Sequence, residues 1–260
     1  IAYLARGEGA AEDRSGLPLL SWIAAAGRQP GNVSLQEALF VPDRSGPLDN
    51  DNLKWAVTRY GAVYTTMYWQ PAILPFLDPY YSNSAHSYCY LQPPPAANHA
   101  VTIVGWDDTY DRKNFRNIPP GDGAFIVKNT GGTLFGEDGY TYVSYYDTGI
   151  GRRNLVFSAA PVSSPTTVYQ HDPLGWTGTL HLGDETDAAW YANIYTAQEA
   201  QPLSAVGFYT TEPQTEYRVF VHLDPDNGPI NQTGHARSRS GVARLPGYHV
   251  VDLDPPVPLT

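Results

Sequence analysis

The sequence predicts an α+β protein in which helices come first and strands dominate the remainder. Hydrophobic residues make up 42% of the 260 residues, which is enough to build a sizeable core. Glycine and proline are frequent, with 24 and 23 residues, as expected where short strands alternate with turns. A chain of this length forms one large domain or two domains of ordinary size.

The composition excludes several classes of protein. The net charge of −10 leaves no basic stripe that could neutralise phosphates, so we expect no nucleic-acid partner. No apolar stretch approaches the roughly 18–20 residues of a membrane span, so this segment is not expected to cross a bilayer. The single cysteine, Cys89, excludes an internal disulfide framework and a cysteine-rich zinc module. We expect no metal and no cofactor.

Helical signals gather in the first sixty residues. Residues 2–6 are typical of the end of a helix, and residues 19–26 of a short apolar helix. Apolar side chains at positions 53, 56, 57 and 60 share one helical face, with capping side chains at 49–51 before them and Gly61 after them. Residues 34–39 fit either a helix with a capping box or a strand.

Strands are expected after Gly61, separated by clusters of glycine, aspartate and proline. The candidates are residues 62–69, 100–106, 123–129, 140–146, 154–157, 189–195, 203–209, 217–221 and 248–252. Residues 161–167 are the best linker, because they are rich in proline, serine and threonine. The expected organisation is therefore a first domain over 1–160, a linker over 161–167, and a β-sandwich over 168–260.

Two polar residues lie at the ends of strongly apolar strands. His99 begins the candidate strand at 100–106, and Asn129 ends the one at 123–129. If these strands pair, the imidazole and the amide become neighbours, and the amide oxygen can select the imidazole tautomer. This is the orienting role of asparagine in a Cys–His–Asn nucleophilic system, where the histidine activates a thiol.

The segments 98–106 and 128–140 resemble the His and Asn motifs of papain-like cysteine peptidases, and they occur in the family's order. The wider sequence, including residues 169–176, looks like the bacterial and archaeal branch with a C-terminal lectin-like domain. By this resemblance His99 is the general base and imidazolium partner, and Asn129 orients it. The implied fold is α+β, the β-rich half of a papain-like domain, followed by a lectin-like β-sandwich that is incomplete at its C-terminal side.

The resemblance also implies an activity and a location. The protein would be a secreted or cell-surface endopeptidase of a bacterium or an archaeon, acting on a peptide or protein substrate. A cell-surface glycan is a further candidate partner for the lectin-like part. The family nucleophile precedes the histidine by a long stretch, so its cysteine is expected upstream of residue 1. Cys89 lies only ten residues before His99 and is expected to be a structural thiol.

The Asn motif departs from the family at two positions. The family usually has Asn-Ser-Trp-Gly, with an indole that covers the His–Asn hydrogen bond, whereas this chain has Gly131 at the tryptophan position. Phe135 stands where a second tryptophan is common. Loss of the cover would admit water and weaken that bond.

The glycine at 131 motivates a rival reading, an inactive pseudopeptidase that presents a module for binding glycan or protein. A third reading is the processed part of a cleaved enzyme, with the cysteine on another chain. For Trp176 and Trp190, packing in the core of the sandwich is the default expectation.

Overall fold

The computed structural model describes residues 1, 4–5, 33–70, 78–161, 167–179, 188–225, 228 and 234–260. Within these ranges there are twelve strands and a single α-helix. Ten of the strands build a large mixed sheet, and the other two form a separate two-stranded sheet. The expected α+β class is therefore wrong, because this part of the chain is mostly β. The helices predicted at 2–6 and 19–26 lie outside the described residues, apart from residues 4–5, and the ambiguous segment 34–39 lies within strand β1 (Val33–Val41).

The chain divides into two compact units, which are described separately. One is built on residues 40–157 and the other on residues 33–39 and 158–260. Strands β1 and β8 (Arg152–Pro161) each have residues in both units. The linker predicted at 161–167 stays a prediction, because residues 162–166 lie outside the described part of the chain.

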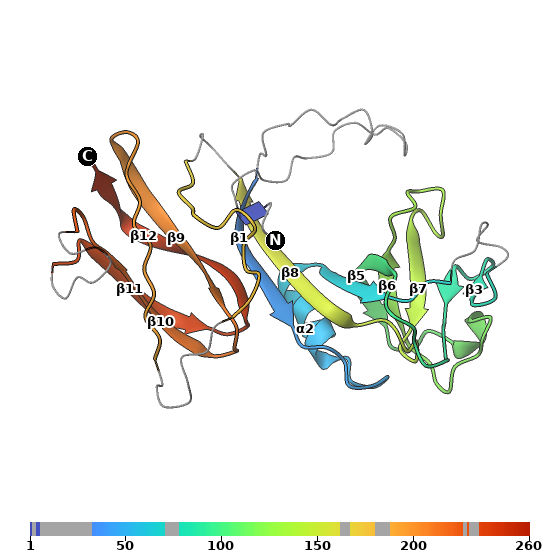
Figure 1. Ribbon diagram of the computed structural model, residues 1–260. Helices are drawn as coiled ribbons and strands as arrows, with labels where there is room; N and C mark the ends of the chain where they lie inside the picture. Colours follow the sequence, from blue (N-terminus) through green and yellow to red (C-terminus); the bar gives the residue numbers. More distant parts are fainter. Residues whose placement is uncertain are drawn as a thin grey trace. The chain divides into compact units, whose positions relative to one another are not determined.

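The unit over 40–157 is a mixed sheet. Its strands are, in spatial order, β3 (Tyr81–Ser82), β4 (Ser87–Tyr88), β7 (Tyr140–Ser144), β6 (Ala124–Lys128), β5 (His99–Asp107), β2 (Val63–Met67) and β8. The pairs between them are antiparallel except β4–β7, which is parallel. Side chains of β2 alternate between buried and half-buried, as expected for a strand with one face on a core. Figure 1 shows β5, β6 and β7 side by side, in cyan to yellow-green.

Helix α2 (Asp51–Tyr60) forms where the apolar periodicity predicts it. It packs against β2 and β5, and its buried side chains are those of Leu53, Ala56 and Val57. Gly61 ends the helix with φ of 83°, a conformation that glycine adopts without a steric penalty. The capping prediction is wrong at Asn50, because its side-chain amide donates to the carbonyl of Pro47 instead of capping the helix.

A buried carboxylate holds the turn between β7 and β8. Asp147 accepts hydrogen bonds from the backbone N–H groups of Gly149 and Ile150 on Oδ1, both at 2.9 Å. Its Oδ2 accepts the N–H of Tyr90, which follows β4, also at 2.9 Å. Burial raises the pKa of Asp147 to about 6, although these donors and the nearby Arg44 guanidinium favour the charged form. Asp147 thus joins two segments that are distant in sequence.

The second unit has strands in two sheets. β12 (Gly247–Leu259) pairs with β9 (Gln201–Thr210) and β1, and β10 (Thr215–Val221) forms a hairpin with β11 (Arg237–Ala243). β10 and β11, in orange-red, lie beside β9 and β12 in Figure 1. A core cluster contains residues from β9, β10 and β12, namely Val221, Leu253, Val257, Leu203 and Val206. The two sheets of this unit therefore pack on one another through an apolar cluster.

The strand expected at 189–195 is not formed. This segment has no regular secondary structure, and none of the described strands pairs with it. Conversely, β11 was not expected from the sequence, because its arginines and serines alternate without an apolar run. Both differences have the same physical reason: a strand is stabilised by its neighbour in the sheet, which local sequence does not specify.

Candidate active site

Strand pairing brings His99 and Asn129 to one face of the sheet. His99 is the first residue of β5, and Asn129 directly follows β6. The two strands are antiparallel, with Thr102 opposite Lys128. If this register continued by one residue, Asn129 would face Val101, and His99 would be its diagonal neighbour on the same face. The backbone N–H of Asn129 donates to the carbonyl of Gly139, which holds the residue in place.

The imidazole and the amide are hydrogen bonded. His99 Nε2 lies 2.9 Å from Asn129 Oδ1, and the same oxygen accepts the backbone N–H of Thr130 at 2.7 Å. Because an amide oxygen only accepts, this network assigns the imidazole proton to Nε2 and leaves Nδ1 as the basic nitrogen. No other residue in the described part of the chain hydrogen-bonds the His99 ring. Nδ1 is therefore the atom able to exchange a proton with a nucleophile or a leaving group.

An aromatic cluster lies against the imidazole. Trp69, just after β2, meets the His99 ring edge to face at a centroid distance of 5.7 Å. Trp69 also packs against Tyr88 and Phe135, and Phe135 stacks on Tyr81. Sequence reasoning did not find Trp69, because nothing near it in the sequence marks it as a neighbour of His99.

The two departures in the Asn motif lie next to each other. Gly131 is exposed, and a Cβ added to it would come within 2.9 Å of the Phe135 Cβ. This is closer than real Cβ atoms approach other side chains, so a tryptophan at 131 would require Phe135 to move. Phe135 is half-buried in the aromatic cluster.

Cys89 lies in a different environment. Its side chain is fully buried with Phe115 and Ala124, and no hydrogen bond joins it to His99 among the described residues. Burial and the Asp147 charge raise the pKa of this thiol to about 12. A nucleophilic cysteine requires a depressed pKa, so Cys89 has the properties of a structural residue.

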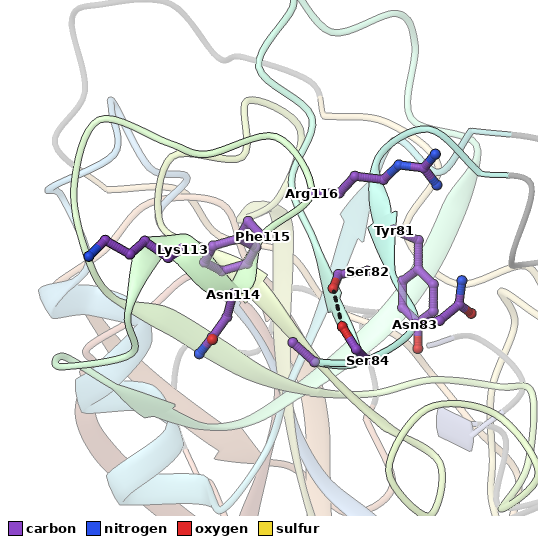
Figure 2. Close-up of a pocket in the computed structure, with 9 residues that line it drawn as sticks. Tyr81, Ser82, Asn83, Ser84, Lys113, Asn114, Phe115 and Arg116 are labelled. Atoms are coloured by element: carbon purple, nitrogen blue, oxygen red, sulfur yellow. Dashed lines mark hydrogen bonds between the residues drawn. The ribbon is translucent and has the colours of Figure 1, made fainter.

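A polar hollow with a volume of about 510 Å³ lies in the same unit, lined by residues 81–85 and 113–116. Figure 2 shows the cationic ends of Lys113 and Arg116 extending to opposite sides of it. Arg116 donates instead to the carbonyl of Asp78. The two cationic ends therefore do not converge on one point of the hollow. No cluster of metal-ligating side chains occurs in the ranges that the structure describes.

The unit that contains β9 to β12 exposes aromatic side chains. Trp190 is 78% exposed, Tyr191 71% and Trp176 47%. Core packing, the default expectation for Trp176 and Trp190, is therefore wrong for this structure. One face of Trp190 stacks on Phe220 of β10 at 5.7 Å.

Comparisons with known proteins give one family match and two similar solved structures. The family described as Lectin like domain matches residues 168–260. No curated protein matches the chain. Among solved structures, the cysteine protease and lectin-like domains of Cwp84, a surface layer associated protein of Clostridium difficile, cover 96% of this chain at 20% identity with a TM-score of 0.72.

A second solved structure is that of the Clostridial cysteine protease Cwp84 after propeptide cleavage. It covers 97% of this chain at 21% identity, with a TM-score of 0.65. The chain spans 54% and 61% of the length of the two solved chains. At these identities the likeness concerns the fold: the chain is similar in fold to a cysteine protease that carries a lectin-like domain.

Proposed function

We propose that this chain is part of a cysteine-type endopeptidase in which His99 and Asn129 serve the active site. The observation that carries the proposal is the hydrogen bond between His99 Nε2 and Asn129 Oδ1, which leaves Nδ1 available for proton transfer. The shared fold with a cysteine protease supports it. Because Cys89 is buried, the nucleophilic thiol is not among these 260 residues. It would come from a segment upstream of them or from a separate chain.

The reaction follows from this geometry. Nδ1 of His99 takes the proton of the cysteine thiol, which gives the thiolate and the imidazolium. The thiolate attacks the peptide carbonyl, and His99 passes this Nδ1 proton to the leaving amine as the C–N bond breaks. Nδ1 then takes a proton from water, whose oxygen attacks the thioester carbonyl and releases the acid and the thiolate. Asn129 keeps the Nε2 proton in place throughout, so that the ring presents Nδ1 to each proton transfer.

Substitutions in the intact protein test this proposal. His99→Ala should lower kcat/KM for peptide hydrolysis by roughly 10²–10⁴-fold, the usual contribution of a positioned acid–base group. Asn129→Ala should cause a smaller loss. His171→Ala is a matched control, because this histidine is exposed and stacks on Tyr195 in the other unit. Unchanged turnover in His99→Ala would overturn the assignment.

A second candidate function is a binding module, either in an inactive pseudopeptidase or beside an active site. The exposed Trp190 and Tyr191 favour a glycan ligand, because sugars stack on accessible aromatic faces. A glycan array probed with the intact protein and with Trp190→Ala tests this function. Binding that the substitution abolishes would support it, and no binding by the intact protein would contradict it.

We also propose a secreted or surface location, because the protein of similar fold, Cwp84, is described as surface layer associated. None of the described helices has the length and apolar character needed to span a membrane.

A further inference from the structure

The His99–Asn129 hydrogen bond lies at the surface of its unit and needs protection from water. Both residues are only partly buried, and Gly131 offers no side chain to cover them. Water competes for an exposed hydrogen bond and weakens it, whereas a low local dielectric strengthens it. A proposed active site that depends on this bond therefore needs another group as a cover.

Trp69 is in the right place to supply that cover. Its indole contacts the His99 ring edge to face, with 5.7 Å between centroids and 61° between planes, within the favourable range for aromatic pairs. On its other sides it stacks on Tyr88 at 4.3 Å and meets Phe135 at 5.8 Å. Phe135, which would have to move for a larger residue at 131, thus packs against the indole.

The backbone of Trp69 is fixed to the residue that precedes His99. Its N–H donates to Asn98 Oδ1 at 2.8 Å, and its carbonyl accepts from Asn98 Nδ2 at 3.0 Å. The pairing of β2 with β5 places Met67 opposite His99, so Trp69 follows directly from the end of this ladder. The two hydrogen bonds between the Trp69 backbone and the Asn98 side-chain amide, together with the pairing of β2 and β5, hold the indole beside the imidazole.

We propose that Trp69 is a positioning residue that shields the His99–Asn129 hydrogen bond from water, replacing the indole that position 131 lacks. This inference rests on the proposed peptidase function only for its biological purpose, because the shielding itself is a property of the hydrogen bond. Trp69 comes from the end of β2, so the cover reaches the site from a different strand than the Asn motif.

The test measures the hydrogen bond directly. In the intact protein labelled with ¹⁵N-histidine, the solvent exchange rate of the His99 Nε2 proton is measured by NMR. Trp69→Ala should speed this exchange roughly two- to tenfold, the fold-change that corresponds to losing one aromatic pair. Trp69→Phe should give an intermediate rate. Trp55→Ala is the matched control, because Trp55 is an exposed tryptophan on α2 that packs on Tyr60, and it should leave the rate unchanged.

Peptide hydrolysis and its pH profile are measured on the same variants, so that a failure of the shielding by Trp69 can be distinguished from a failure of the peptidase function. If exchange quickens in Trp69→Ala and the acid limb of the profile shifts, both the shield and the peptidase function are supported. If exchange quickens but even the intact protein hydrolyses no peptide, the peptidase function fails and the shield stands. If exchange is unchanged in a folded Trp69→Ala, the shield is wrong whatever the activity.

A milder variant, Asn98→Ala, keeps the proposal testable if Trp69→Ala does not fold. Asn98→Ala removes only the two exposed hydrogen bonds to the Trp69 backbone and leaves the aromatic cluster intact. It should quicken exchange in the same direction as Trp69→Ala, by a smaller factor. If Trp69→Ala does not fold, unchanged exchange in both Trp69→Phe and Asn98→Ala overturns the proposal.

Discussion

In the intact protein, ionisation of Asp147 should lower the free energy of unfolding as the pH rises from about 4 to about 6. Replacing Asp147 by asparagine should abolish this part of the pH dependence. The free energy of unfolding falls with rising pH wherever the folded state binds more protons than the unfolded state. In the unfolded chain this carboxyl ionises near its ordinary value of 3.8, whereas burial raises the pKa in the folded chain to about 6. The folded state therefore holds an extra proton between these values.

The size of the effect follows from the shift. Stability contributed by the protonated Asp147 is fully present below about pH 4 and is lost as the pH rises through 6. A shift of about two units corresponds to about 3 kcal/mol. The asparagine side chain of the variant cannot titrate. The side-chain amide of asparagine has an NH₂ group in place of one carboxylate oxygen, and this group would face a backbone N–H that now donates to Asp147. The loss of that hydrogen bond lowers the stability of the variant by the same amount at every pH.

Urea denaturation at pH 4, 5, 6 and 7 measures this difference. The free energy of unfolding of the intact protein minus that of Asp147→Asn should fall by about 2 kcal/mol across the series, because the unfolded carboxyl is already partly ionised at pH 4. Asp138→Asn is the control for the chemical change itself, because Asp138 is exposed and its positive φ suits asparagine equally well. A constant difference for Asp147→Asn would refute the reasoning. A difference that rises with pH would mean that the three N–H donors and Arg44 outweigh burial.

Three further predictions concern the same unit. Cys89 should resist thiol reagents in the folded protein and react on unfolding, because burial raises its pKa to about 12; rapid labelling by a disulfide reagent under native conditions would contradict this. Gly123→Ala should destabilise by about 1–3 kcal/mol in urea titrations, since φ is +104° and the new Cβ would meet the Tyr145 ring; an unchanged midpoint would contradict it. Asn154→Ala should lower the free energy of unfolding by about 1–3 kcal/mol, because its buried side chain accepts a hydrogen bond from Thr65 Oγ1 at 2.7 Å. Its effect should be coupled to that of Thr65→Ala in a double-mutant cycle, and strictly additive effects would contradict this.

Much of the first unit could be predicted locally. The apolar face of α2 and the runs that became β2, β5, β6 and β7 carry the periodicities of helix and strand in short windows of sequence. The two-residue strands β3 and β4 were missed, because they are too short to show a periodicity. The α+β class was wrong because the described residues are mostly strands in a large mixed sheet, and the ambiguous segment 34–39 lies within β1.

The site was predictable to a different extent for each residue. His99 and Asn129 end apolar strands and match a known pair of motifs, so the sequence alone indicated both of them. Their 2.9 Å contact required the pairing of β5 with β6. The catalytic roles of both residues stay a prediction until the substitutions are measured.

The sequence by itself determined the positions of α2, β2, β5, β6 and β7, and which polar residues lie at the ends of β5 and β6, because the periodicity of these elements depends on neighbouring residues in the chain. Only the tertiary structure decided that Trp69 contacts His99 and that Cys89 is buried beside Phe115. Both outcomes depend on which strands pair and in which register. Such contacts join residues that are tens of positions apart, and no local pattern encodes them.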